Sequence, residues 1–407
     1  MKSKIIKKDK IYLDYSATTP VDPGVLGVMT KVMKNVFGNP SSVHSFGREA
    51  KGVIEESRRM CLDFIGADEV GEIAFTSGGT EADNWIFEGD LTKAINGKKP
   101  HFITTGIEHK AILEKLKHIE KRGLAEATFL MVDKYGHISL DSLKKEIKDN
   151  TALISVMYAN NEVGTVQPIR EIGKYLEKLN KERTSKKLNR IYLHTDAVQA
   201  FPYLNCNVKY LHVDLMSVSG HKIYGPKGVG FLYIKRGTPI GRMTIGGGQE
   251  FGKRAGTENV WGIAGLARAV ELLKEKQEKD KERIQKLRDQ LVENILKIPG
   301  TELTGHPIER LPNLASFIFR GIEGESILIS LDLEGMAVST GSACTSGALA
   351  PSHVLTACGY SPEDSQGNIR ISLGRFTKES DIKYLLKVLP AAVEKLRVIS
   401  PMNLKNC

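Results

Sequence analysis

The sequence predicts an α/β fold, with a mainly parallel sheet in a large domain and a smaller α/β domain after it. Between residues 72 and 195, strand-like apolar runs alternate with helical segments. Such alternation is typical of parallel strands that are joined and covered by helices. A long helical segment at 261–296 then leads into a mixed pattern of strands and helices, which indicates the second unit.

The individual elements follow from the hydrophobic pattern and its interruptions. Residues 11–20 begin with a strand-like run that stops at Pro20, and helical patterns follow at 23–37 and 47–65. Gly66, directly after the second helix, suits a left-handed C-terminal cap. The alternating region is predicted to hold strands at 72–76, 101–105, 128–132, 152–158 and 191–195, and helices at 80–89, 109–123, 140–148 and 169–178. The last unit is predicted to hold strands at 315–319 and 369–373, and helices at 326–333 and 379–398.

We expect three parts along the chain. Residues 1–20 form an N-terminal segment that packs with the small domain, and residues 21–260 form the large domain. Residues 261–407 form a linker helix and the C-terminal small domain. The stretch at 177–190 is basic, and we expect it to be a solvated loop.

The composition is that of an ordinary globular protein. Of 407 residues, 41% are hydrophobic and 26% charged, and the net charge of +10 comes from a scattered surplus of Lys and Arg, so no direct nucleic-acid partner is expected. The five cysteines have no CxxC spacing and indicate neither a disulfide framework nor a metal site. No apolar run reaches the roughly 18 residues of a membrane helix, and residues 1–10 lack the apolar core of a signal peptide. We therefore expect no membrane partner and a cytoplasmic location.

One lysine, Lys222, lies in a short turn between two strand-like runs at 213–219 and 229–234. The turn contains Ser219-Gly-His-Lys222 and, after it, Gly225-Pro-Lys-Gly228. A tight turn of this kind withdraws the amine from bulk water, and desolvation lowers the pKa of an amine. An amine with a free lone pair attaches to the aldehyde of pyridoxal phosphate (PLP). An exposed lysine in a hairpin is the alternative interpretation.

Polar residues follow several of the predicted strands, where ligands of parallel sheets bind. Gly79 and Thr80 follow the strand at 72–76, and their backbone N–H groups suit a phosphate. His109 follows the next strand, either as a helix cap or as a catalyst. Asn161 offers an amide after a third strand. Asp196 ends a further strand, either as a cap or as the partner of a pyridine nitrogen.

The stretch 339–350 is rich in small residues and carries no charged side chain. Such a stretch is poorly suited to a packed core, so we expect a mobile loop. Its cysteine, Cys344, lies among hydroxyl-bearing residues, whereas Cys61 falls in an apolar helical pattern and is expected in the core. Cys344 is therefore the candidate nucleophile, and the site would have to favour its thiolate form.

Six motifs carry a resemblance to a known family. They are Thr76-Ser-Gly-Gly-Thr-Glu81, Glu108-His-Lys110, Asn160-Asn-Glu162, Asp196-Ala-Val-Gln199, Ser219-Gly-His-Lys222 and Gly341-Ser-Ala-Cys-Thr-Ser346. In combination they resemble the cysteine desulfurases of the NifS/IscS type, and the likeness runs from Tyr12 to Phe376. The resemblance implies the aspartate-aminotransferase-like fold of PLP enzymes of fold type I. It also implies conversion of L-cysteine to L-alanine, with the sulfur passed on as a persulfide.

The resemblance implies catalytic roles for the matching residues. Lys222 would carry the PLP cofactor and move protons, and His109 would stack on the PLP ring and act as acid or base. Cys344 would receive the sulfur atom. Asp196 would pair with the pyridine nitrogen, and Gln199 with the ring oxygen.

It also implies binding roles. The residues that would bind the phosphate within one subunit are Gly79, Thr80, Ser219 and His221. Thr257 would reach the phosphate of the neighbouring subunit, which requires a homodimer. Asn161 would contact cofactor or substrate, and the guanidinium of Arg370 would bind the substrate carboxylate.

The acceptor of the sulfur stays open between an iron–sulfur scaffold and a tRNA-thiolation factor. The sequence ends at Cys407 without the further tail with which bacterial housekeeping members dock the scaffold, so that docking mode is also open. Two other interpretations use the same fold, a selenocysteine lyase or a class V aminotransferase. An interpretation from another class is a non-catalytic RNA-binding or assembly protein, which would lack a yellow cofactor.

Overall fold

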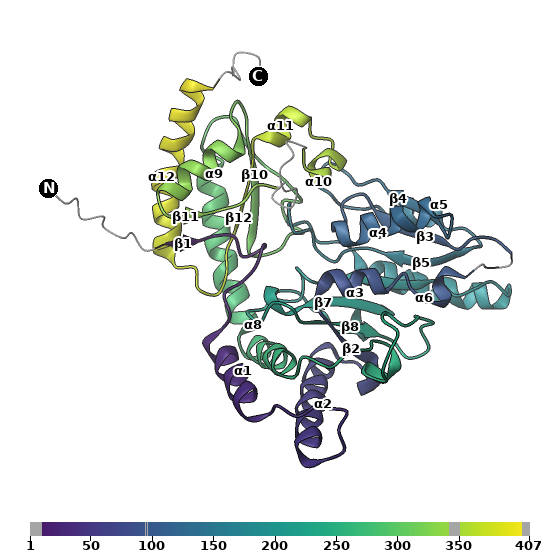
Figure 1. Cartoon of the computed structure of the whole chain (residues 1–407). Helices are drawn as coiled ribbons and strands as arrows, with labels where there is room; N and C mark the ends of the chain where they lie inside the picture. Colours follow the sequence, from purple (N-terminus) through teal and green to yellow (C-terminus); the bar gives the residue numbers. More distant parts are fainter. Residues whose placement is uncertain (1–9, 94, 96, 342–350, 401–407) are drawn as a thin grey trace.

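The structure is a computed structural model, and it describes residues 10–93, 95, 97–341 and 351–400. Figure 1 shows the larger sheet on one side of the molecule and the smaller sheets, with helices α9 and α12, on the other. The long helix α8 (Val260–Ile295) runs between them. None of the helices in the described part has the length and the hydropathy of a membrane span.

Within the described residues, seven strands form the larger sheet, in the order β2-β8-β7-β6-β5-β3-β4. Their bounds are β2 (Ile73–Thr76), β3 (His101–Thr105), β4 (Glu126–Leu130), β5 (Thr151–Ser155), β6 (Tyr192–Asp196), β7 (Leu215–Ser219) and β8 (Gly230–Ile234). Strand β8 pairs antiparallel with both of its neighbours, while the other pairs are parallel. The predicted α/β fold with a mainly parallel sheet is confirmed.

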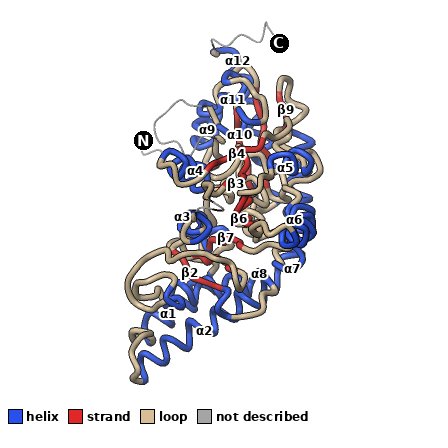
Figure 2. The backbone as a smooth tube through the Cα atoms, turned by 90° about the vertical axis from the view of Figure 1, so that its right-hand side faces the viewer, coloured by secondary structure: helices blue, strands red, loops and turns tan. Residues whose placement is uncertain are grey.

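The strands of this sheet are buried over their whole length in β2, β3, β5, β7 and β8. Helices cover both faces, which is why these strands read as continuous apolar runs in the sequence. Figure 2 shows α3 and α4 on one side of the strands and α5 and α6 on the other. The helices of this region are α1 (Pro23–Asn35), α2 (Ser45–Ile65), α3 (Gly79–Trp85), α4 (Lys110–Lys121), α5 (Leu140–Glu146), α6 (Ile169–Ser185) and α7 (Val208–Leu211).

Local chemistry fixes several helix ends as the sequence indicates. Gly66 ends α2 with a φ of 66°, the left-handed conformation that glycine adopts without steric cost. Asp22 caps α1, and its carboxylate accepts a hydrogen bond from Gly24 N. Cys61, on α2, is fully buried in the core, as expected.

The expectation of a solvated loop at 177–190 is wrong for residues 177–185, which are helical, whereas residues 186–190 lie outside any helix or strand. Helix α6 continues to Ser185, and Arg183 on its last turn is buried. The Arg183 guanidinium donates to the backbone oxygens of Asp149 (2.7 Å) and Asn189 (2.8 Å). These carbonyls replace water around the charge, so a basic side chain becomes part of the packing.

The second part of the molecule holds two smaller sheets. Strand β10 (Leu314–Phe319) lies between β9 (Thr301–Leu303) and β12 (Asn368–Ser372), antiparallel to both. Strand β1 (Ile11–Tyr12) pairs in parallel with β11 (Met336–Ala337). The helices here are α9 (Gly324–Leu333), α10 (His353–Ala357), α11 (Pro362–Gln366) and α12 (Glu379–Ile399).

The N-terminal segment thus belongs to the smaller sheets at its start and then crosses to the larger one. Asp14 forms a bridge with Ser372, and Ser16 N donates to the Ser372 hydroxyl (2.8 Å). Thr19 N donates to His221 O (3.0 Å). We refer to residues 12–19 as the N-terminal strap. The division of the chain at residues 20 and 260 stays a prediction.

Candidate active site

Functional side chains gather at one edge of the larger sheet. Strands β3, β6 and β7 are parallel, and β2 runs in the same direction because both it and β7 are antiparallel to β8. Their carboxyl ends therefore meet at one edge, where ligands of such sheets bind. The predicted residues that follow these ends are Gly79, His109, Asp196 and Ser219.

Asp196 is the last residue of β6 and is only 6% exposed. Its Oδ1 accepts a hydrogen bond from Val198 N (2.9 Å), so the side chain closes a turn rather than capping a helix. Burial raises the pKa of the Asp196 carboxyl, while the charges of His109 and Lys222 lower it. The three groups are therefore close enough to act on one another.

His109 is both the helix cap and a neighbour of Asp196. It is the N-cap of α4, and its Nδ1 accepts a hydrogen bond from Ala111 N (3.2 Å). Burial lowers the pKa of His109, and Lys222 and Lys110 lower it further, against the opposing effect of Asp196. The ring is thus neutral, and since Nδ1 accepts, its proton lies on Nε2.

Lys222 ends the short helical turn Gly220–Lys222 and is half-buried. Its amine donates to the backbone oxygens of Ser16 and of Ala17, the latter at 2.7 Å. Both carbonyls belong to the N-terminal strap. Lys222 therefore lies in the turn between β7 and β8, as predicted, and its amine reaches the strap.

A cavity of about 380 Å³ lies beside these groups. Its walls come from the strap, from the β2–α3 turn and from the β7–β8 turn: Ala17, Thr18, Ser77, Gly78, Gly79, Thr80, Glu81, Ser219, His221, Lys227 and Gly228. Gly78 has a φ of 148°, which a side chain would strain. His221 bonds through Nδ1 to the Thr18 hydroxyl (3.1 Å), and burial lowers the pKa of His221 to about 4. The sequence analysis did not single out Lys227, although it lies in the Gly-Pro-Lys-Gly turn.

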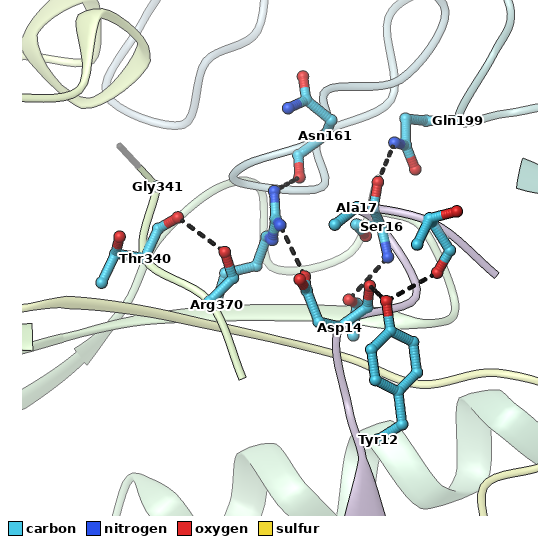
Figure 3. A network of polar contacts seen from close by, with 12 residues as sticks. Tyr12, Asp14, Ser16, Ala17, Asn161, Gln199, Thr340, Gly341 and Arg370 are labelled. Atoms are coloured by element: carbon cyan, nitrogen blue, oxygen red, sulfur yellow. Dashed lines mark hydrogen bonds and ion pairs between the residues drawn. The ribbon is translucent and has the colours of Figure 1, made fainter. Parts of the chain in front are cut away.

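The guanidinium of Arg370, on β12, faces the same region from the smaller sheet (Figure 3). Its Nη2 donates to Asp14 Oδ1 (2.8 Å), and its Nη1 donates to the backbone oxygen of Asn161 (3.0 Å). Arg370 is buried, and its Nε has no hydrogen-bond partner among the described residues. Gln199 donates to Ser16 O (2.9 Å), so the strap also fixes that amide.

Two further buried carboxyls, those of Glu108 and Asp83, lie near Asp196, and no role was predicted for either. Glu108 Oε1 accepts from the Thr105 hydroxyl (2.7 Å) and from Met157 N (2.9 Å). Burial raises the pKa of Glu108 to about 8. Burial and the nearby Asp196 raise the pKa of Asp83 well above its ordinary value. Glu108 is therefore largely protonated at neutral pH, and Asp83 holds its proton more strongly than an ordinary aspartic acid.

Among the predicted residues, Gly79, Thr80, Ser219 and His221 line this cavity, and the others that the structure describes do not. Cys344 lies outside the described residues. Thr257 is exposed on a loop after β8 and is not among the residues that line the cavity. Arg254, on the same loop, pairs with Glu81 at the cavity wall (2.9 Å).

Comparisons with known proteins identify the family. Residues 11–385 match the model of the aminotransferase class-V family. The cysteine desulfurase IscS of Methanosarcina thermophila is 48% identical over 396 residues, which cover 97% of this chain and 95% of that protein. The chain belongs to the cysteine desulfurases of the class-V aminotransferase family. The resemblance to NifS/IscS-type enzymes is thereby confirmed.

Solved structures of this family have the same fold. A NifS-like protein superposes with a TM-score of 0.87 at 37% identity and covers 95% of this chain and 100% of its own. The structure of SspA in complex with cysteine gives a TM-score of 0.78 at 33% identity, covering 91% of this chain and 100% of its own. The chain is accordingly a PLP-dependent enzyme of fold type I.

Desulfurase motifs lead directly to most of the site, but the strap residue Asp14 was missed. It lies 356 positions from Arg370, and no local pattern connects the two. The available signal was the motif-like start Tyr12-Leu-Asp-Tyr-Ser-Ala-Thr-Thr19, whose polar residues follow a two-residue strand.

Proposed function

We propose that this enzyme converts L-cysteine to L-alanine and passes the sulfur, as a persulfide on Cys344, to an acceptor. The observation that carries this proposal is that Lys222, Asp196 and His109 lie near one another at the edge of the sheet that also holds the cavity lined by Gly79, Thr80, Ser219 and His221. The related SspA structure contains cysteine, which supports the substrate.

The residues present fit PLP. We propose that the phosphate is held by Gly79, Thr80, Ser219 and His221, which line the cavity together with the cation of Lys227. Asp196 would face the pyridine nitrogen, because a buried carboxylate is stabilised by a positive charge placed against it. Gln199 and His109 would contact the ring oxygen and the ring face. When bound, PLP supplies an aldehyde for amines and a ring that takes up the electron pair left at the substrate α-carbon.

The chain's own groups would then bind substrate and move protons. Lys222 would hold PLP in the resting enzyme, and its amine, displaced by the amine of cysteine, would accept the α-proton. Arg370 would bind the substrate carboxylate, since its buried Nε–H has no partner among the described residues. Asn161, whose backbone oxygen fixes Arg370, would contact cofactor or substrate.

In the sulfur step, the Cys344 thiol would be the only reactant needed besides cysteine. Cysteine and the Cys344 thiol would give alanine and the Cys344 persulfide, with no external oxidant. The C–S bond of cysteine breaks and an S–S bond forms, while the α- and β-carbons of alanine are completed by protons. Two equivalents of an added thiol would then be oxidised to a disulfide, which releases the outer sulfur as sulfide and regenerates the Cys344 thiol.

The test is the pair of variants Cys344→Ala and Lys222→Ala. Cys344→Ala is expected to stay yellow but to release no sulfide from cysteine in the presence of a thiol reductant. Lys222→Ala is expected to lose both the absorbance of attached PLP and alanine formation. Sulfide release by Cys344→Ala at the rate of the unmodified enzyme would refute the role of Cys344. Comparing cysteine with selenocysteine as substrates would separate a desulfurase from a selenocysteine lyase.

We further infer a homodimer in which Thr257 of each subunit reaches the phosphate of the other. Large apolar side chains are exposed near the loop that carries Thr257, including Phe37, Val43, Phe46 and Ile245. The loop and this region touch, since Gln249 donates to the Ser41 hydroxyl (3.4 Å). An exposed apolar patch of this kind favours a subunit contact.

The acceptor would be an iron–sulfur scaffold or a tRNA-thiolation protein in the cytoplasm. Both accept sulfur from a persulfide, and the scattered basic surplus favours neither. Adding each candidate acceptor to enzyme that carries labelled persulfide would identify which one takes the sulfur.

A further inference from the structure

A single buried carboxyl, that of Glu162, lies where the chain enters and leaves the segment that contains Cys344. The described residues on either side are Gly341 and Pro351. The Ser352 hydroxyl donates to Glu162 Oε2. A β-carbon placed on Gly341 would lie 2.9 Å from the same oxygen and 3.6 Å from Ser352 Cβ. Residues 341 and 352 therefore come together against one carboxyl oxygen.

Each flank is also fixed to a regular element. Gly341 N donates to Asn368 Oδ1 (2.8 Å), and the Asn368 amide in turn donates to the Ser316 hydroxyl (2.9 Å) in the neighbouring strand β10. On the other side, the Ser352 oxygen caps α10 by accepting from Val354 N (3.2 Å). The Glu162 carboxyl thus accepts from one flank and lies against the other. Gly341 is held by the smaller sheet, whereas α10 also packs on the larger part, where His353 Nε2 donates to Glu108 O (3.0 Å).

Glu162 itself belongs to the cofactor side of the site. Its backbone N–H donates to Asn160 Oδ1 (2.8 Å), and the Asn160 amide donates to Ile107 O (3.0 Å), two residues before His109. The preceding residue, Asn161, is held by Arg370. Figure 3 shows Asn161, Arg370 and Gly341 gathered in one network. Glu162 therefore connects the flanks of the Cys344 segment to the residues around PLP.

The Glu162 carboxyl is suited to accept a hydrogen bond, and it does not need to be charged to do so. Glu162 is 8% exposed, and burial raises the pKa of its carboxyl against the effects of Ser352, His353 and Arg370. A carboxyl oxygen accepts from a hydroxyl whether or not the group is ionised. Leaving the Ser352 hydroxyl without a partner at this buried position would carry a desolvation cost.

We propose that Glu162 is a positioning residue for sulfur transfer: it holds Gly341 and Ser352 together, and so fixes where the Cys344 segment joins the active site. The inference rests on the proposed role of Cys344. It assigns no catalytic contact to Glu162, which acts through the two flanks. It separates two steps of the reaction, because cysteine can react with the PLP site without Cys344.

The test mixes holoenzyme with one equivalent of cysteine and follows two signals. The cofactor absorbance reports substrate reaction at PLP, and mass spectrometry reports the Cys344 persulfide. For Glu162→Ala we expect persulfide to form about tenfold more slowly, while the absorbance change stays within about twofold. Glu162→Gln is expected to stay within about threefold of the unmodified enzyme in both signals, since its amide oxygen accepts from Ser352.

Serine variants provide a matched control that leaves Glu162 in place. Ser352→Ala removes both the contact with Glu162 and the cap of α10, whereas Ser352→Thr keeps a hydroxyl. Ser361→Ala removes a comparable cap, since Ser361 caps α11 by accepting from Asp364 N (3.0 Å) but does not touch Glu162. We expect Ser352→Ala to slow persulfide formation and Ser352→Thr and Ser361→Ala to leave it unchanged.

Three results would overturn the proposal. They are persulfide formation at the normal rate in Glu162→Ala, an equal slowing of both signals in that variant, and a loss in Glu162→Gln as large as in Glu162→Ala. The first would remove the positioning role, the second would indicate general damage to the site, and the third would indicate a need for charge. Failure of the proposed function itself is distinct, because Cys344→Ala would then still release sulfide.

Discussion

The buried Glu108 joins two strand ends at the active site, because one of its oxygens accepts both from Thr105, the last residue of β3, and from Met157 after β5. A carboxyl so enclosed by protein keeps its proton at neutral pH, since the ionised form would lose its hydration. His109 follows directly in the chain, so the neutral acid at 108 helps to fix the backbone that places the imidazole. Single residues thus act here through their protonation state as much as through their contacts.

Glu108 should make stability depend on pH in a defined direction. Its folded-state pKa of about 8 lies above the ordinary value of 4.5, so the folded chain holds a proton that the unfolded chain releases. Its contribution to stability is complete below the ordinary value and is lost as the pH rises towards 8. Glu108→Gln cannot ionise and keeps the accepting oxygen. Between pH 5 and 8, its melting temperature should fall less steeply than that of the unmodified enzyme, and parallel curves would contradict this.

Several of the residues that sequence reasoning found lie in short motifs next to a strand end. Asp196, His109 and Lys222 could be predicted because parallel strands bring their carboxyl ends together. Asp14 and Glu162 act through partners 356 and 190 positions away, and neither distance leaves a periodic trace in the sequence. Such pairs can be recognised only in the three-dimensional structure, where the smaller sheets lie against the larger one.

Among the elements, the N-terminal strap contacts the largest share of the site. Its backbone oxygens accept from Lys222 and Gln199, and its side chains at 14 and 18 bond to Arg370 and His221. Strands β2 to β8 could be predicted from their buried apolar runs, whereas the strap has only a two-residue strand to mark it. Helix α6 was predicted too short for a related reason, because the carbonyls that receive Arg183 come from another loop.

Loosening the strap without touching the cofactor contacts should weaken PLP retention. The Thr19 hydroxyl donates to His221 O (2.9 Å) and accepts from Tyr224 N (2.8 Å). Thr19→Val keeps the shape but leaves the buried Tyr224 N–H unpaired, at a cost of about 1–3 kcal/mol. We expect it to lose PLP several times faster, measured as the decay of cofactor absorbance with a PLP trap present.

The control for this experiment is Thr304→Val. Thr304 is fully buried and its hydroxyl donates to Ser316 O (3.2 Å) in the smaller sheet, away from the cavity. The Thr304→Val variant should lower thermal stability by an amount similar to that of Thr19→Val but leave the rate of PLP release unchanged. Equal release rates for the two variants would show that the strap has no special part in holding PLP.

At the scale of the whole molecule, we propose the exposed apolar surface around Phe37, Val43 and Phe46 as the contact between subunits. Val43 is 88% exposed, so a charge there disturbs no internal packing. Val43→Asp should convert a dimer into a monomer by light scattering, and it should lower PLP retention because Thr257 would no longer reach the second phosphate. Leu333→Asp, at an equally exposed position (81%) on α9, should change neither property. A Val43→Asp variant that remains dimeric would exclude this surface as the subunit contact.

The pairing of β1 with β11 also has a consequence for biosynthesis. A ribosome releases the strap first, at about 5–20 residues per second, but its partners at 336–337, 370 and 372 emerge last. The larger sheet can therefore form before the residues of β11 and β12 that pair with the strap have been synthesised. A nascent chain that stalls before residue 370 would hold all seven described strands of the larger sheet but would lack Arg370, the residue that bonds to Asp14 of the strap.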